Sequence, residues 1–195
     1  MILMMTVAAQ AAEFPKVDLF RLKGGEKVPF TLKSETKYVA LYQSASWCPP
    51  CRKTTPPLVE EYQRMLEMED MPVEIVLMSG DRSEKDALDY MKLYDMRWPA
   101  LEWSSTPELI QYSAEGIPHL VLVEIATGKV ITKGTGPGGV EAAVERMREF
   151  TGVTSDSAFK VNGFMDKYGL LVMVALSGVI ILLFQKWRMK RAATK

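Results

Sequence analysis

Histidine and cysteine are scarce in this chain of 195 residues, which has one His and two Cys. A structural zinc site takes four ligands, usually Cys and His, so we expect no metal. The cysteines, Cys48 and Cys51, fall within four residues, and a disulfide between them closes too small a loop to staple a fold. Haem attachment requires a His directly after the second Cys, where Arg52 stands. The pair is therefore expected to serve chemistry, with no bound cofactor.

Net charge is also absent, because 24 basic residues balance 24 acidic ones. Neither a nucleic-acid partner nor an acidic substrate is favoured by this balance. The length suits one compact domain with accessory segments. We find no internal repeat or low-complexity tract, and we expect a monomer that binds no nucleic acid.

The N-terminus lacks basic residues, since the first is Lys16. Residues 1–12 form an apolar run that ends in small residues, and Ala9-Gln10-Ala11 fits a signal-peptidase site. We predict a signal peptide over residues 1–12. A hydrophobic N-terminal strand is the alternative, because the usual positively charged start of a signal peptide is missing.

Charged side chains are absent from residues 168–184, a stretch at the short end of the range for a membrane-spanning helix. The stretch has no polar face, so we predict a transmembrane helix that contacts the lipid bilayer. Residues 185–195 carry five basic side chains and no acid, which predicts a cytoplasmic tail. We therefore expect a single-pass protein of the cell membrane, with its catalytic domain extracytoplasmic, on the periplasmic side.

The central part alternates strand and helix patterns, which predicts an α/β domain over residues 13–152 with helices on both faces of a sheet. Residues 153–167 are polar and predict a linker to the membrane. A hairpin is expected over 19–30 around Gly24-Gly25. The other expected strands are 38–43, 73–79, 120–124 and 130–133, and the expected helices are 51–67, Ser83 to Tyr94, one starting at Thr106-Pro107, and 140–151 ended by Gly152.

The segment Trp47-Cys48-Pro49-Pro50-Cys51 carries the chemistry, because it follows a strand and opens a helix. A thiolate is the nucleophile of disulfide exchange, and a helix N-terminus favours it. We expect Cys48, nearer the exposed end, to attack a substrate disulfide. Cys51, one turn later, is expected to resolve the mixed disulfide.

Residues 44–57 (SASWCPPCRKTTPP) resemble the active-site segment of the tryparedoxin and nucleoredoxin branch of the thioredoxin superfamily. Met78-Ser79-Gly80-Asp81-Arg82 and Met96-Arg97-Trp98-Pro99 are similar to a further segment of that branch. Gly116-Ile117-Pro118, before an apolar strand, resembles the superfamily's cis-proline loop. The resemblance covers about residues 17–150. It implies a thioredoxin-like fold, with a central mixed β-sheet flanked by helices.

The resemblance also implies roles for single residues. Pro118 is expected to be cis and to lie against the cysteines, although a trans proline at the start of a strand is the alternative. Ile117 is expected to offer its backbone to an extended substrate, and Trp47 to shield the pair. Tyr42 stands where thioredoxin has a buried acid that relays protons, so the proton acceptor for Cys51 stays open.

His119 follows Pro118 and admits two interpretations. It could reach the cysteines and change their pKa. Side chains alternate along a strand, however. If Ile117 or Pro118 faces the cysteines, His119 is therefore expected to face elsewhere. This alternation favours a structural role.

Pro49 and Pro50 have no N–H, so two donors that could stabilise the Cys48 thiolate are missing. A less stabilised thiolate favours a reductant, and we predict a protein-disulfide reductase. Its expected partners are protein disulfides and a membrane or thioredoxin-family electron donor. The alternatives are a disulfide oxidant or isomerase, a membrane-tethered client-binding or chaperone module, and an oxidoreductase of the endoplasmic-reticulum lumen.

Overall fold

A computed structural model describes residues 13–153, with only the backbone described at 104–108. The elements are β1 (Leu19–Lys23), β2 (Glu26–Phe30), β3 (Tyr38–Ser44), α1 (Pro49–Leu66), β4 (Val73–Ser79), α2 (Glu84–Leu93), β5 (Ala100–Leu101), the 3₁₀ helix η1 (Trp103–Tyr112), β6 (His119–Glu124), β7 (Val130–Thr135) and α3 (Gly136–Thr151). The expected signal peptide, transmembrane helix and basic tail, and nearly all of the expected linker, lie outside the described residues. Between residues 13 and 153, no helix combines the length and apolar character needed to cross a membrane.

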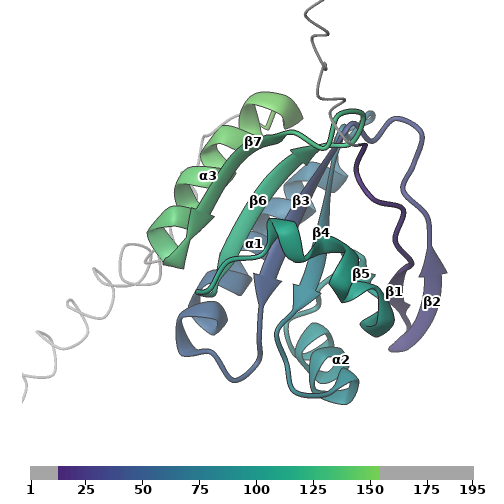
Figure 1. Cartoon of the computed structure of the whole chain (residues 1–195), viewed down its shortest axis with the longest axis vertical. Coiled ribbons are helices and arrows are strands. Elements are labelled where there is room, and N and C mark those ends of the chain that lie inside the picture. Colours follow the sequence, from purple (N-terminus) through teal and green to yellow (C-terminus); the bar gives the residue numbers. More distant parts are fainter. Residues whose placement is uncertain (1–12, 154–195) are drawn as a thin grey trace, which may run out of the picture. The chain divides into compact units, whose positions relative to one another are not determined.

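The strands form one mixed sheet in the order β2-β1-β5-β4-β3-β6-β7 (Figure 1). The pairs β3–β4 and β4–β5 are parallel, and the remaining neighbours are antiparallel. Strands β3, β4 and β6 lie inside the sheet with helices over it, which explains their nearly continuous apolar sequences. The mixed sheet flanked by helices agrees with the expected fold.

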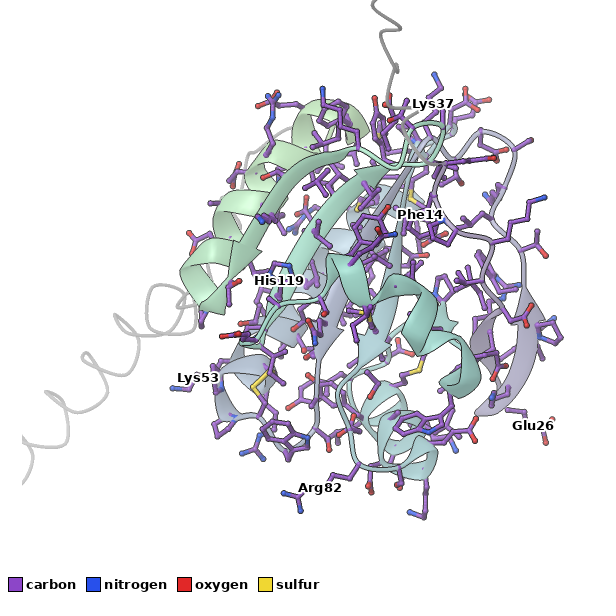
Figure 2. The ribbon with its side chains drawn as sticks, viewed as in Figure 1. Phe14, Glu26, Lys37, Lys53, Arg82 and His119 are labelled. Atoms are coloured by element: carbon purple, nitrogen blue, oxygen red, sulfur yellow. A yellow bond between two sulfur atoms is a disulfide. The ribbon has the colours of Figure 1, made fainter. Side chains whose placement is uncertain are left out.

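Alternate side chains of β3 face two different layers. Val39 and Leu41 belong to a core cluster with Leu109 and Tyr112 of η1, and with Phe14 of the segment before β1 (Figures 1 and 2). On the opposite face, the next side chains along the strand point towards α1 and α2. The redox pair therefore follows a strand that is fixed from both sides.

Several predicted boundaries agree with the structure. Gly24 and Gly25 both have positive φ in the β1–β2 turn, a conformation that glycine adopts at little cost. Ser83 caps α2 through a hydrogen bond from the Asp86 N–H, and Gly152 ends α3 with a φ of 70°.

Other boundaries differ for identifiable reasons. Helix α1 begins at Pro49, and α3 at Gly136 with a proline in its first turn, because proline suits the first helical positions. The helix expected at Thr106-Pro107 begins earlier, at Trp103, and is a 3₁₀ helix. Strand β5 was not predicted, because two residues carry no readable periodicity.

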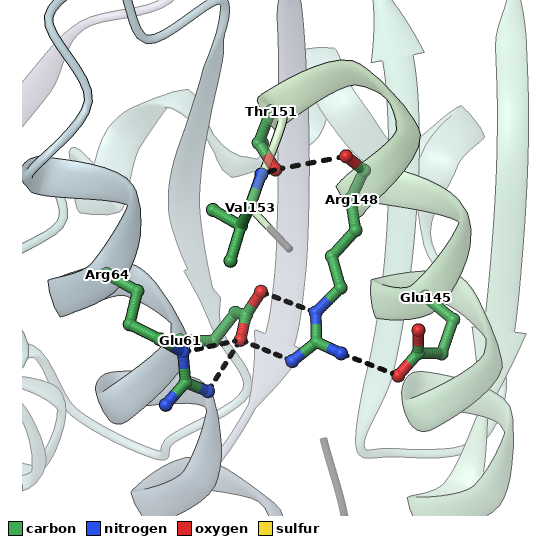
Figure 3. Close-up of polar contacts among 6 residues, drawn as sticks. All are labelled: Glu61, Arg64, Glu145, Arg148, Thr151 and Val153. Atoms are coloured by element: carbon green, nitrogen blue, oxygen red, sulfur yellow. Dashed lines mark hydrogen bonds and ion pairs between the residues drawn. The ribbon is translucent and has the colours of Figure 1, made fainter. Parts of the chain in front are cut away.

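A buried ion-pair network joins α1 to α3 (Figure 3). The carboxylate of Glu61 is fully buried and accepts hydrogen bonds from Arg148 Nε at 2.8 Å and Nη2 at 2.7 Å. Arg64 donates to the same carboxylate at 2.7 Å, and Glu145 accepts from Arg148 at 2.8 Å. This network holds the helix that carries the cysteines against α3.

Candidate active site

The two cysteines lie where β3 passes into α1, and they form a disulfide with their Cα atoms 5.2 Å apart. Cys48 is 3% exposed and Cys51 is fully buried. Both pack against Ala45, with Ile117 beside them. Of the two sulfur-bearing side chains, Cys48 is therefore the one with exposed surface, and the expected division of roles between the cysteines stays a prediction.

The first turn of α1 presents one backbone donor to Cys48. The Cys51 N–H donates to Cys48 Sγ at 3.2 Å, so Cys48 caps the helix with its own sulfur. Pro49 and Pro50 occupy the first two helical positions and have no N–H to add. Of the first three residues of α1, Cys51 is therefore the one that offers an N–H to stabilise a Cys48 thiolate.

The loop before β6 lies against the disulfide. The Ile117–Pro118 peptide bond is cis, as the resemblance implied. The Ile117 carbonyl oxygen is 3.7 Å from Cys48 Sγ, close enough to accept a hydrogen bond from the Cys48 thiol when the disulfide is reduced. The Pro118 carbonyl accepts a hydrogen bond from the Gly136 N–H at 2.8 Å, which ties this loop to the end of β7. The expected substrate contact through the Ile117 backbone stays a prediction.

Trp47 is the exposed aromatic side chain next to the pair, with 54% of its surface accessible. Its indole N–H donates to the Gly80 carbonyl at 3.0 Å, which orients the ring towards the β4–α2 loop. The expected shielding of the cysteines by Trp47 stays a prediction.

Asp81 fixes the chain just before Cys48, a role that the sequence did not reveal. Its Oδ1 accepts from the Ser46 N–H at 2.9 Å and from the Ser46 hydroxyl at 2.7 Å. Its Oδ2 accepts from the Ser79 hydroxyl at 2.9 Å. The Gly80 N–H donates to the Ser44 carbonyl at 2.8 Å. The end of β4 thereby holds the cysteine-bearing loop in place.

A cluster of four buried hydroxyls, which we call the hydroxyl cluster, lies beneath the first turns of α1. It consists of Tyr42 and Ser44 of β3, Thr55 of α1 and Tyr90 of α2. Burial raises the pKa values of both Tyr42 and Tyr90 above their ordinary value, so both phenols stay neutral at physiological pH. The sequence could not reveal this cluster, because its members come from three separate elements.

His119 faces the neighbouring strand (Figure 2). Its Nδ1 is 2.8 Å from Thr135 Oγ1 on β7, and burial lowers the pKa of the imidazole. His119 and Thr135 also line a cavity of about 290 Å³ together with Lys133. The hydrogen bond to Thr135 agrees with the structural role favoured by side-chain alternation.

Among residues 13–153, no group of three or more His, Cys, Asp and Glu side chains is arranged to hold a metal ion. The chemistry that the described residues can perform is the exchange between two thiols and a disulfide. In that exchange we expect Cys48 to react first and the buried Cys51 to close the ring.

Known proteins resemble this chain in sequence and fold. A sequence model of the family described as Thioredoxin-like matches residues 35–130. Nucleoredoxin of Xenopus laevis is 40% identical over 103 residues, which cover 51% of this chain and 24% of that protein. Tryparedoxin of Trypanosoma brucei brucei is 41% identical over 99 residues, which cover 49% of this chain and 66% of that protein. The match thus spans about a quarter of the nucleoredoxin and just under two thirds of the tryparedoxin.

Among solved structures, a thioredoxin from Wuchereria bancrofti superposes with a TM-score of 0.54 at 31% sequence identity. The superposition covers 74% of this chain and 92% of the thioredoxin.

Proposed function

The chain belongs to the thioredoxin-like family of oxidoreductases, and from this membership we propose that it reduces protein disulfides through Cys48 and Cys51. The observation that carries the proposal is the disulfide at the β3–α1 junction, with one sulfur 3.7 Å from the carbonyl oxygen before the cis proline. A nearly buried pair next to the loop before β6 suits a substrate chain that delivers its disulfide to Cys48.

The proposed reaction has two exchange steps. The Cys48 thiolate attacks a substrate disulfide, a bond forms between Cys48 and one substrate sulfur, and the other substrate sulfur leaves as a thiolate that takes up a proton. Cys51 then loses its proton and attacks Cys48 Sγ, which releases the second substrate thiolate. Two electrons pass to the substrate, and the Cys48–Cys51 disulfide is left.

The reducing direction is supported by the prolines. Because Pro49 and Pro50 contribute no N–H, the Cys51 N–H is the donor that the first turn of α1 offers to the Cys48 sulfur. A weakly stabilised thiolate makes the dithiol form less stable, and the pair a better reductant. An electron donor must then regenerate the dithiol, and we propose a membrane or thioredoxin-family protein for that role.

Serine variants of the two cysteines test the proposed reaction. Cys51→Ser should accumulate mixed disulfides between Cys48 and its substrates, because the resolving thiol is gone. Cys48→Ser should lose reduction of a protein disulfide to background, as followed by a thiol assay. Full activity of Cys48→Ser would refute the proposal, and retained client binding by inactive Cys48→Ser would favour the client-binding module.

We further propose that residues 168–184 hold the domain at the extracytoplasmic face of a cell membrane, with residues 185–195 in the cytoplasm. The support is the charge-free stretch followed by a basic tail. In intact cells, a membrane-impermeant thiol reagent should modify Cys48 of the reduced protein. Modification only after the membrane is opened would place the domain on the cytoplasmic side.

A further inference from the structure

The hydroxyl cluster converges on the peptide group of the resolving cysteine. Thr55 Oγ1 lies 3.0 Å from the Cys51 carbonyl oxygen, 3.0 Å from the Tyr42 hydroxyl and 2.5 Å from the Tyr90 hydroxyl. The Tyr90 hydroxyl is 3.0 Å from Ser44 Oγ. Three elements, β3, α1 and α2, therefore meet at one threonine that contacts Cys51.

Hydrogen-bonding capacity fixes the direction of these contacts. A carbonyl oxygen can only accept, so Thr55 donates its single hydroxyl hydrogen to Cys51. Both tyrosine hydroxyls must then donate to the two lone pairs of Thr55 Oγ1. Ser44 in turn donates to Tyr90. Every hydrogen of the cluster points along a path that ends at the Cys51 carbonyl.

The turn of α1 that follows Cys51 has fewer backbone hydrogen bonds than a regular α-helix. In an α-helix the carbonyl of residue i accepts from the N–H of residue i+4. Pro56 and Pro57 lie inside α1 and have no N–H, so the carbonyls of Arg52 and Lys53 lose that donor. The turn that follows Cys51 thus lacks two of its own hydrogen bonds, and contacts from other elements gain importance there.

We propose that Tyr42, Thr55 and Tyr90 are positioning residues for Cys51, which hold its sulfur in line to attack the mixed disulfide. The inference rests on the proposed two-step exchange and assigns these residues to its second step. Since both phenols stay neutral, they act through fixed hydrogen bonds and leave the ionisation of Cys51 to other groups. Displacement at sulfur depends strongly on alignment, so a small shift of α1 slows the step.

A chromogenic aromatic disulfide separates the two steps in the reduced full chain. Attack by Cys48 releases one coloured thiolate and leaves the second aromatic thiol bound to Cys48. Attack by Cys51 then releases the second coloured thiolate and closes the ring. Rapid-mixing absorbance should therefore show two phases, one for each cysteine.

Thr55→Val, Tyr42→Phe and Tyr90→Phe should each slow the second phase, by about tenfold for Thr55→Val, with the first phase within about twofold of the parent protein. Thr55→Ser keeps the hydroxyl and should restore the second phase. Tyr62→Phe is the matched control, because Tyr62 is a buried tyrosine of the same helix whose hydroxyl bonds to Glu74 instead. It should leave both phases unchanged.

An unchanged second phase in folded Thr55→Val, or equal slowing in Tyr62→Phe, would overturn the inference. The reduction of a protein disulfide is measured on the same samples. If the parent protein shows both coloured phases but does not reduce the protein disulfide, the proposed function fails while the positioning of Cys51 is still judged by the variants.

Discussion

Glu74 is a buried acid of β4, 3% exposed, whose Oε1 accepts from the Tyr62 hydroxyl at 2.8 Å and from the Ile75 N–H at 3.1 Å. Burial raises the pKa of Glu74 to about 7, although these hydrogen bonds and the charges of Lys33 and Arg21 act in the opposite direction. The folded protein thus holds this proton more tightly than the unfolded chain. Stability contributed by the proton is present at low pH and is lost as the pH rises from the ordinary pKa of 4.5 towards 7.

Glu74→Gln should remove this pH dependence. The amide oxygen of glutamine can still accept from Tyr62, but the side chain no longer titrates. Between pH 4.5 and pH 8, the free energy of unfolding of the variant should rise relative to the parent protein by about 3 kcal/mol. Urea titrations across this range measure the difference, with exposed Glu60→Gln as the control. Parallel pH profiles for the parent and Glu74→Gln would contradict the assignment.

Residues that act through local sequence could be predicted, whereas residues that act through tertiary contact could not. Cys48, Cys51 and the cis Pro118 are recognised from short motifs, and the structure places them together. The contact between Asp81 and Ser46 could not be predicted, because it depends on β3 and β4 ending side by side.

At the scale of elements, the buried carboxylate of Glu61 on α1 forms the ion pair that joins this helix to Arg148 of α3. Burial alone would raise the pKa of Glu61, but hydrogen bonds from Arg148 and Arg64 outweigh it and lower the pKa below its ordinary value. Glu61 is therefore charged in the folded protein. The guanidinium groups of Arg64 and Arg148 stabilise this buried charge (Figure 3).

Arg148→Met should cost about 3 kcal/mol of unfolding free energy, because it leaves the charge of Glu61 without its main partner. Combining it with Glu61→Leu should return stability to within about 1 kcal/mol of the parent protein, since an apolar pair can replace a buried ion pair. Arg146→Met, which removes an exposed ion pair with Glu149, should leave the free energy of unfolding close to that of the parent protein, because solvent screens an exposed pair. Denaturant titrations measure the free energy of unfolding of each variant. If the losses of the two single variants add up in the double variant, Glu61 and Arg148 do not stabilise each other as a pair.

Elements with a strong period were predictable, and elements that depend on their neighbours were not. The strands 38–43 and 73–79 agree with β3 and β4 because buried strands read as apolar runs. Strand β5 is defined by its pairing with β1 and β4 on either side. A strand of two residues is too short for a sequence pattern to predict it. Helices α1 and α3 begin earlier than the ranges expected from the sequence, because each has proline at its first positions, where a missing N–H costs no helical hydrogen bond.

At the scale of the whole molecule, the domain over residues 13–152 and the segments around it rest on different grounds. The order of strands and helices predicted a sheet with helices on both faces, and the resemblance to the thioredoxin superfamily implied that the sheet is mixed. The described fold and the family membership agree with both. The signal peptide, linker, transmembrane helix and basic tail stay predictions from composition and charge. Cys48 and Cys51, to which the redox chemistry is assigned, lie within the domain.

The equilibrium reduction potential of the Cys48–Cys51 pair in the full chain distinguishes a reductant of disulfides from an oxidant. Titration against glutathione and dithiothreitol buffers gives the fraction of disulfide at each potential. We predict a value near that of thioredoxin, about −270 mV, because the helix end offers the Cys48 thiolate one N–H donor. A value near that of the oxidant DsbA, about −120 mV, would contradict it and make the protein an oxidant or isomerase of disulfides.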